Sequence, residues 1–463
     1  MTRDASKLAI RNWIDEHTSI IDAANDSLWD FAEVALQETQ SCAYLQNELK
    51  RGGFSILKGA ADTPTSFVAQ WGSGSPCIGF LAEYDALQGL SQDKVPVCKP
   101  VKEGAPGHAC GHCTLGAAML GAVLALKAQM EQEKLPGTIR FYGCPAEESL
   151  EGKVRMSRDH LFDDCDIALS CHPNDISYVW ARKSVSLISL AYTFLGRPSH
   201  AGLDPWNGRS ALDAVELMNV GANYLREHIP PTWRMHYIIT DGGAAPNIVP
   251  EKAEVWYMLR ADDREQAEQL QQRLGRIAQG AALMTDTRVE EKFLAGCYNY
   301  LPNTVLAEML LDCLKSVGSP PWTEEDRAFA KALSQEINLA SKQAAIRQFS
   351  LNDEDVQDGL ATKVCENCYQ AGILGASTDV GDVSWQLPVG CFSFASTVVG
   401  APGHSWFYTS ACGSGIGHRG AHAAAKVLAL AGYRLLTEPA LMQAAKAEHQ
   451  TNLQGKQYHC PLW

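Results

Sequence analysis

The decapeptide GHACGHCTLG at residues 107–116 holds residue types whose spacing could do chemistry. Cys110 and Cys113 have the C-x-x-C spacing of a thiol–disulfide redox pair. Cys110 and His112 instead offer a thiolate and an imidazole, which together suit a zinc-like ion. The decapeptide alone is compatible with both chemistries, so residues elsewhere in the chain must decide between them.

Polar residues follow apolar, strand-like runs at several other places in the chain. They are Asp85 after IGFLAEY, Glu147 and Glu148 after RFYGCPA, His172 after DIALSC, and His404 in APGHSW. In proteins with a parallel sheet, ligands collect beyond the carboxyl ends of the strands. Each of these residues alone would be interpreted as a capping or surface side chain. Their joint occurrence at matching strand ends favours a metal centre that also includes Cys110 and His112.

The redox interpretation lacks the surroundings of a thioredoxin-type motif. Such a motif directly follows a core strand, usually with a preceding tryptophan, whereas here Ala109 precedes Cys110 after the polar stretch SQDKVPVCKPVKEGAPGH. A second C-x-x-C, Cys365 with Cys368 in VCENCYQ, has the cysteine spacing of a structural zinc site. It lacks, however, a glycine for the turns that such a site prefers. A thiol–disulfide or structural zinc protein that uses Cys110 and Cys113 is the alternative from a different class.

The composition is that of a globular chain with two domains. Its 463 residues exceed the usual size of a single core, and its 46% hydrophobic and 20% charged residues argue against disorder. The net charge of −14 argues against nucleic acid and against an anionic membrane as partners. No apolar stretch approaches the roughly 20 residues of a membrane span, and the N-terminus lacks the apolar core of a signal peptide. Because the fifteen cysteines are odd in number and irregularly spaced, we expect a reduced, cytoplasmic protein.

Up to about residue 185, helical segments alternate with apolar strands. We expect helices over 7–24, 25–51 and 114–132, and strands within 76–87, 137–149 and 165–173. This alternation predicts a mainly parallel sheet with helices on both faces.

Between about residues 186 and 297 the order becomes strand, helix, two strands, helix and strand. That order predicts an α+β unit with two helices on one face of an antiparallel sheet. Helical segments then return, with a buried strand at 389–399 and an Ala-rich helix at 415–437. The simplest architecture is a discontinuous α/β catalytic domain, residues 1–185 and 298–463, with an inserted ferredoxin-like α+β domain for dimerisation or as a lid, residues 186–297.

Seven motifs together resemble the aminoacylase/carboxypeptidase-like metallopeptidases, in particular their amidohydrolase branch, which has Cys-Gly-His where other branches carry an aspartate. The motifs are HACGH at 108–112, the pair Glu147-Glu148, His172, SHAG at 199–202, GRSALDA at 208–214, PNIVP at 246–250 and His404. EYDALQGLSQ, RFYGCPAEE and ASTDVGDVSWQLP are similar to the B-type subunits of p-aminobenzoyl-glutamate hydrolases. Cys113 departs from the pattern, because the branch usually has an aspartate after CGH.

The resemblance implies a site for two divalent ions, zinc or manganese. It assigns their ligands to Cys110, His112, Glu148, His172 and His404. Glu147 matches the general base, which must reach a water without being tied to a metal. Asp85 matches an aspartate that fixes the orientation of a ligand.

The resemblance also assigns residues of the inserted domain. His200 in SHAG matches the histidine that stabilises the oxyanion, and in the family it reaches the site of the neighbouring subunit. Asn247 and Arg260 match the residues that bind the free carboxylate of the substrate in the family, and we expect them on adjoining strand ends.

The activity that the resemblance implies is metal-dependent hydrolysis of the amide bond of N-acyl amino acids. The leading substrate is p-aminobenzoyl-glutamate, which would give p-aminobenzoate and glutamate. A dipeptide or another N-acyl amino acid conjugate is the alternative within this chemistry. The expected partners are the small-molecule substrate and a second chain, in a homodimer or a heterodimer with a related A-type subunit.

Overall fold

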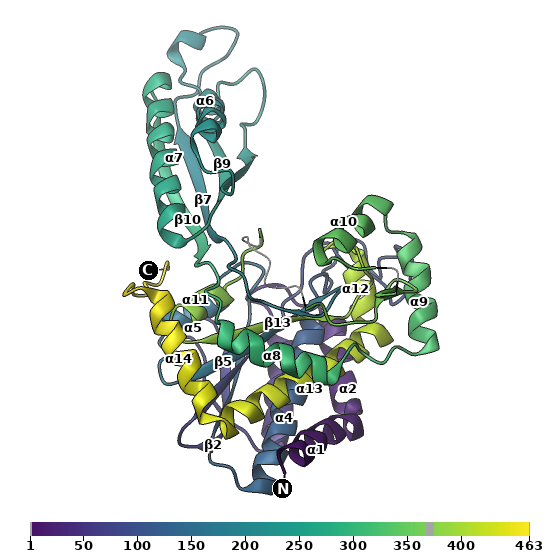
Figure 1. Cartoon of the computed structure of the whole chain (residues 1–463). Helices are drawn as coiled ribbons and strands as arrows, with labels where there is room; N and C mark the ends of the chain where they lie inside the picture. Colours follow the sequence, from purple (N-terminus) through teal and green to yellow (C-terminus); the bar gives the residue numbers. More distant parts are fainter. Residues whose placement is uncertain (1, 353, 367–374, 463) are drawn as a thin grey trace. The chain divides into compact units, whose positions relative to one another are not determined.

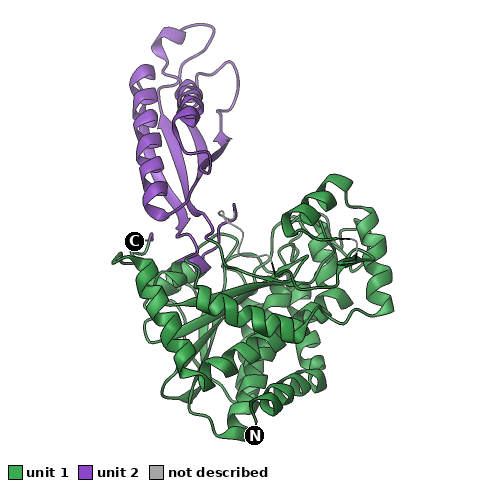
Figure 2. Cartoon of the chain, in the orientation of Figure 1, with its two compact units in different colours: residues 1–182, 301–372, 382–460 green, residues 183–300, 373–381, 461–463 purple. Residues whose placement is uncertain are grey.

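Two units, each with its own hydrophobic core, make up the chain in a computed structural model that describes residues 2–352, 354–366 and 375–462. Unit 1 comprises residues 1–182, 301–372 and 382–460 (Figure 2). Unit 2 comprises residues 183–300, 373–381 and 461–463. Unit 1 is therefore discontinuous in sequence, and most of unit 2 is a single insertion into it.

A seven-stranded sheet with the order β1-β2-β4-β3-β5-β13-β6 forms the centre of unit 1 (Figure 1). The four central strands, β4, β3, β5 and β13, run parallel, and antiparallel strands flank them. The strands are β1 (Ser55–Lys58), β2 (Phe67–Ser73), β3 (Cys77–Glu83), β4 (Gly137–Cys144), β5 (Ile167–Asn174), β6 (Tyr178–Val179) and β13 (Val389–Ala395). Every residue of β3 and β13 is buried, which explains their unbroken apolar runs. The predicted α/β class is confirmed.

Both faces of this sheet are covered. On one face α13 packs so closely that a Cβ at its Gly432 would lie 3.0 Å from the ring of Phe80 in β3. On the opposite face Tyr142 of β4 packs on Phe162, with ring centroids 4.8 Å apart. Phe162 follows α5, so α5 and the loop after it cover this second face.

The helices of unit 1 include three at the N-terminus where the sequence predicts two. Helix α2 ends because Ala32 adopts the left-handed conformation (φ 43°), and the carboxylate of Glu33 then accepts the N–H groups of Gln40 and Ser41 in the first turn of α3. Helix α13, in contrast, spans the predicted range. The helices are α1 (Arg3–Glu16), α2 (Thr18–Phe31), α3 (Thr39–Arg51), α4 (His112–Glu133), α5 (Gly152–Arg158), α8 (Thr304–Val317), α9 (Glu324–Gln335), α10 (Leu339–Phe349), α11 (Val380–Ser384), α12 (Trp406–Cys412), α13 (Gly415–Thr437) and α14 (Pro439–Leu453).

Unit 2 is an antiparallel sheet of order β10-β7-β9-β8 with two helices packed on one face. The chain order β7-α6-β8-β9-α7-β10 together with this strand order is the predicted ferredoxin-like arrangement. The elements are β7 (Ser186–Leu195), α6 (Ala211–Leu225), β8 (Arg234–Asp241), β9 (Lys252–Ala261), α7 (Arg264–Thr285) and β10 (Arg288–Cys297). Strand β9 alternates buried and half-buried residues, which gives the sheet one face toward the helices and one face away from them.

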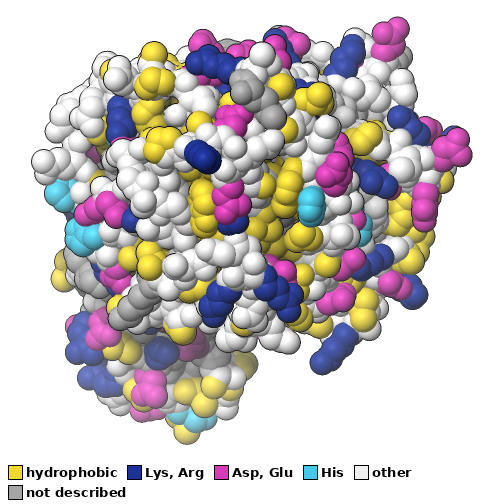
Figure 3. All heavy atoms as spheres, turned by 90° about the horizontal axis from the view of Figure 1, so that it is seen from below, with side chains coloured by type: hydrophobic (Ala, Val, Ile, Leu, Met, Phe, Trp, Pro, Cys, Tyr) yellow, Lys and Arg dark blue, Asp and Glu magenta, His cyan; other side chains and the backbone are white. Residues whose placement is uncertain are grey.

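Helix α4 is, by length and composition alone, apolar enough to cross a membrane, which corrects the expectation that no stretch approaches that length. Of its most apolar window 83% is buried inside the molecule, as is typical of the core helix of a folded protein. On the face drawn in Figure 3, Lys and Arg side chains lie interspersed with Asp and Glu side chains.

Candidate active site

Side chains from four parallel strands and one helix meet at the carboxyl edge of the central sheet of unit 1. Asp85 lies just beyond β3, Glu147 and Glu148 beyond β4, His172 near the end of β5, and His404 beyond β13. Cys110 and His112 join them because α4 begins at His112. This is the edge at which parallel α/β sheets bind ligands, and all seven residues that the sequence predicts for the metal centre lie there.

His112 is held in one orientation by Asp85. Its Nδ1 lies 2.8 Å from Oδ1 of Asp85, and both side chains are fully buried. Because the carboxylate accepts the proton on Nδ1, the lone pair of Nε2 is left for a metal. Asp85 also accepts the backbone N–H of Glu148 through Oδ2 at 2.9 Å, so one carboxylate positions two of the predicted ligands.

Gly111 allows this approach of helix and strand. It has a φ of 81°, and a Cβ there would lie 2.8 Å from Pro173 and 2.9 Å from the sulfur of Cys412. A larger residue would therefore push the start of α4 away from β5.

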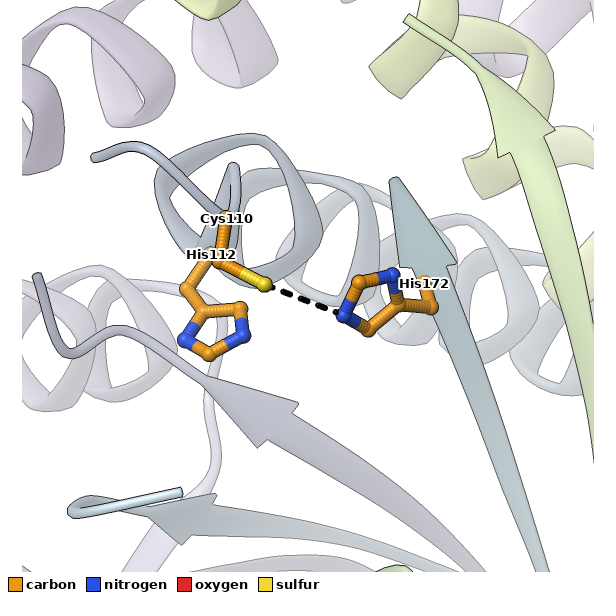
Figure 4. A group of neighbouring side chains, drawn as sticks. All are labelled: Cys110, His112 and His172. Atoms are coloured by element: carbon orange, nitrogen blue, oxygen red, sulfur yellow. Dashed lines mark hydrogen bonds between the residues drawn. The ribbon is translucent and has the colours of Figure 1, made fainter. Parts of the chain in front are cut away.

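Cys110 and His172 face one another directly (Figure 4). The distance from Sγ to Nε2 is 3.3 Å, and Nδ1 of His172 lies 2.8 Å from the carbonyl oxygen of Pro173. Because the carbonyl accepts the Nδ1 proton, His172 also presents its Nε2 lone pair toward the centre.

Glu148 and His404 form the other side of the cluster. Oε2 of Glu148 lies 3.5 Å from Nε2 of His404, which stands in a left-handed backbone conformation (φ 52°) and donates its N–H to the carbonyl of Ala109. Ligand atoms therefore gather in two groups that share one sulfur, and within each group they lie within 4.8 Å of one another. The groups are Cys110, His112 and His172, and Cys110, Glu148 and His404.

The donor set fits two divalent ions. Nε2 of His112, Oε1 of Glu148 and Oε2 of Glu83 are buried atoms without a hydrogen-bond partner in the part of the chain that the structure describes. Such atoms cost free energy unless something else satisfies them. Two ligands at Zn–N and Zn–O lengths of about 2.1 Å around a tetrahedral ion lie about 3.4 Å apart, close to the separations seen here.

Burial and charged neighbours shift the pKa values of the cluster. Burial opposes protonation of His112, but Cys110 and Asp85 raise its pKa well above the ordinary value. Burial, reinforced by Glu148, raises the pKa of the Cys110 thiol well above its ordinary value. Burial also raises the pKa of Glu148 to about 7, although His112 counteracts it. Burial and His112 lower the pKa of His172 to about 4, which keeps the imidazole neutral. Bound cations reverse this penalty for the thiolate and the carboxylate, and they require a neutral imidazole.

Cys113 points away from this centre. Its side chain is fully buried beside the thiol of Cys412 and the hydroxyl of Thr114, whereas Cys110 faces His172. The fourteen described cysteines are all free thiols. Cys365 is buried, and its C-x-x-C partner Cys368 lies outside the described residues.

Glu83 and Lys153 also belong to this cluster, although the sequence did not predict them. Glu83 ends β3 with 2% of its side chain exposed, and its Oε2 lies 3.3 Å from Nε2 of His112. Lys153 in α5 is fully buried and lies 2.7 Å from Oε1 of Glu83. The sequence signal that could have identified Glu83 is a charged residue at the end of a strand that is otherwise wholly apolar.

In unit 2, His200 and Asn247 lie side by side in adjoining loops. Ala201 donates its N–H to the carbonyl of Asn247, and His200 pairs with Ile248 in an isolated β-bridge. Nδ1 of His200 accepts the N–H groups of Gly202 at 3.1 Å and Leu203 at 3.2 Å. The imidazole proton therefore resides on Nε2, so the exposed ring can act as a hydrogen-bond donor.

Arg260 lies far from these two residues. Strand β9 begins at Lys252, next to the Asn247 loop, and Arg260 is near its other end, half-buried and donating to Oγ of Ser377 at 2.8 Å. At about 3.3 Å per residue, the eight steps from residue 252 to 260 span about 26 Å. This corrects the expectation that Asn247 and Arg260 lie on adjoining strand ends.

Comparisons with known proteins agree with this fold and site. A family described as a peptidase dimerisation domain matches residues 183–283. The B-type subunit of the p-aminobenzoyl-glutamate hydrolase of Escherichia coli is 39% identical over 94% of this chain and 93% of its own length. A Xaa-Arg dipeptidase of Mus musculus is 27% identical over 96% of this chain and 92% of its own length.

Solved structures share the fold. A dinuclear metal-binding peptidase of the M20 family from Bacillus subtilis matches with a TM-score of 0.53 and 15% identity, covering 90% of this chain and 99% of that one. From the full-length relative at 39% identity, the dimerisation-domain match and this shared fold, the chain belongs to the M20 family of metal-dependent hydrolases that act on amide bonds.

Proposed function

We propose that the protein hydrolyses N-acyl amino acids with a free carboxylate, with p-aminobenzoyl-glutamate as the leading substrate. The observation that carries this proposal is the pair of ligand groups that share Cys110, with Glu147 beside them. The E. coli relative that is 39% identical supports the choice of acyl group.

Two ions, zinc or manganese, would be held by Cys110, His112, Glu148, His172 and His404. When bound, such ions supply a nucleophilic water at neutral pH and polarise the amide carbonyl. Asp85 acts by fixing the tautomer of His112.

Glu147 is the proposed general base. It is 7% exposed, and its Oε2 lies 3.9 Å from Nε2 of His112. From there its carboxylate takes a proton from the attacking water and delivers it to the leaving amine. The Nε2–H of His200 would donate to the oxyanion that forms on the former carbonyl oxygen.

Arg260 would bind the substrate carboxylate, and Asn247 would assist from a second chain. A guanidinium binds a carboxylate through two parallel hydrogen bonds, which selects substrates with a free acid. Because Asn247 and Arg260 lie at opposite ends of β9, one chain cannot bring both to a single small substrate, so the site would be shared between two chains.

Unit 2 offers a surface for that second chain. Leu217, Val220 and Tyr224 form one exposed face of α6, and Ile238 and Ile239 are exposed on the edge strand β8. Apolar side chains gathered in this way are typical of a protein–protein interface. The second chain would be another copy of this protein or a related A-type subunit.

The test is a panel of substrates given to protein of known metal content. We expect p-aminobenzoyl-glutamate to be cleaved, its α-amide at the free carboxylate to be cleaved far more slowly, and chelation to abolish both reactions. Faster hydrolysis of dipeptides than of every N-acyl amino acid would contradict the proposed substrate class. Activity that survives complete removal of metal would contradict the mechanism.

A further inference from the structure

Glu83 and Lys153 form a buried ion pair at the edge of the metal centre. Glu83 is 2% exposed and Lys153 is fully buried, and Nζ lies 2.7 Å from Oε1. Removing two charges from water costs several kcal/mol per ion, which the attraction within the pair only partly returns. Because burying this ion pair costs free energy, its position beside the predicted metal ligands requires a functional explanation.

The second oxygen of Glu83 is directed at His112. Oε2 lies 3.3 Å from Nε2 of His112, and neither atom has a hydrogen-bond partner among the described residues. Nδ1 of His112 already donates to Asp85, so in the neutral ring, the form that binds a metal, Nε2 carries a lone pair and cannot donate to Glu83. In that form, two acceptor atoms face each other in a buried space, and a cation between them satisfies both.

The separation of these acceptors suits a shared ion. Two ligands on one tetrahedral zinc ion, each about 2.1 Å from it, lie about 3.4 Å apart. The Sγ of Cys110 and Nε2 of His172 show the same 3.3 Å separation in the group to which His112 belongs. Glu83, His112 and Glu147 also have ligand atoms within 4.8 Å of one another.

We propose that Glu83 is a further metal ligand, which binds through Oε2 the ion that Cys110, His112 and His172 hold. Lys153 is a positioning residue that binds Oε1 and so restricts the carboxylate to one metal bond. The inference rests on the dinuclear centre of the proposed function and adds to it a ligand that the family motifs do not include.

The charge of the centre supports this role. Three buried carboxylates, Glu83, Asp85 and Glu147, and two half-buried groups, the carboxylate of Glu148 and the thiolate of Cys110, bring five negative charges into one region. Two divalent ions supply four positive charges, and the ammonium of Lys153 supplies the fifth. Lys153 thus allows the centre to use an additional anionic ligand without a net charge, which a buried site would not tolerate.

The test measures the zinc content and the affinity of each ion by competition with a chelator. The variants are Glu83→Gln, Lys153→Met and the double variant, which removes both buried charges and so avoids an unpaired one. Glu38→Gln is the matched control, because Glu38 is equally buried but its two oxygens already accept from Leu36, Thr65 and Ala146. The visible absorption of the Co²⁺-loaded proteins reports the coordination number independently of activity.

We expect wild type, Lys153→Met and Glu38→Gln to hold two ions. The double variant should bind one of the two at least about 100-fold more weakly than Lys153→Met, beyond the 10–100-fold typical of groups that only support a ligand. The Co²⁺ spectrum should change with it. If the double variant holds both ions as tightly as Lys153→Met, Glu83 is not a ligand. If wild type holds fewer than two ions in excess zinc, the dinuclear centre itself is wrong.

Discussion

Asn247 and Arg260 lie at opposite ends of the same strand, β9. Asn247 precedes Lys252 at its start, in contact with the loop of His200, and Arg260 is one residue from its last residue, Ala261. The eight residue steps of the strand from Lys252 to Arg260 span about 26 Å. If both residues serve one small substrate, they must come from different chains.

A shared site predicts complementation between inactive chains. His200→Ala should lower kcat by about 10²–10³ with little change in KM and in metal content, because an oxyanion donor acts mainly in the transition state. Glu147→Gln chains should also be inactive. In a mixed dimer, one site combines Glu147 of the first chain with His200 of the second, so an equal mixture should regain up to about a quarter of wild-type activity.

The control for complementation is a mixture of His200→Ala and Asn247→Ala chains. These residues lie side by side and would enter the same site from the same chain, so no mixed dimer has an intact site. Recovery in this control, or no recovery with Glu147→Gln in dimers shown to exchange subunits, would contradict the shared site.

The two cysteines of the C-x-x-C motif should behave differently. Cys110→Ser should lose metal and activity together, because its sulfur belongs to both ligand groups. Cys113→Ser should keep most activity, because Cys113 is buried beside Cys412 and faces away from the ligands. Metal content and kcat/KM of the two variants provide the measurement, and equal loss in both would instead favour a redox pair.

The location of the site at the edge of the sheet could be predicted because Asp85, the pair Glu147-Glu148 and His172 each follow an apolar run. The register of parallel strands then brings Asp85, Glu148 and His172 together without further information. Glu83 carries a similar signal, a charged residue at the end of an apolar strand, but that signal alone does not assign it a role. Its role depends on Lys153, whose place beside it is set only when α5 packs on the sheet.

Hydrophobic periodicity does not fix the ends of helices and strands, and two of the wrong predictions share this cause. The ten-residue length of β9 separates Asn247 from Arg260, although the two positions are only thirteen apart in the sequence. The break after α2 depends on a left-handed residue, Ala32, and on the carboxylate of Glu33. Neither residue type is a strong helix terminator, so the sequence carries little signal for the break.

Asp175, next to the end of β5, should make stability depend on pH. It is 6% exposed, its Oδ2 accepts the N–H of Gly400 at 2.9 Å, and burial raises its pKa to about 6. The native chain then keeps a proton that the unfolded chain loses above its lower pKa. Its contribution to stability is therefore full below about pH 4 and lost as the pH rises through 6.

The measurement is urea unfolding of metal-free protein between pH 4.5 and 7.5. Asp175→Asn should gain stability relative to wild type across this interval, by up to about 3 kcal/mol at 1.36 kcal/mol per pKa unit. Replacement of the exposed Asp30 by asparagine is the control, because that carboxylate is solvated in both states. A difference between Asp175→Asn and wild type that does not vary with pH would contradict the assignment.

Substitution of each of the adjacent glutamates, Glu147 and Glu148, should separate the loss of metal binding from the loss of proton transfer. Glu148→Gln should reduce the number of bound ions, because its carboxylate lies with Cys110 and His404 in one ligand group. Glu147→Gln should keep both ions and lose about 10²–10⁴ in kcat, the usual contribution of a general base. Metal analysis and kinetics on the same preparations decide the assignment, and equal loss of metal from both variants would show that the two roles are not divided in this way.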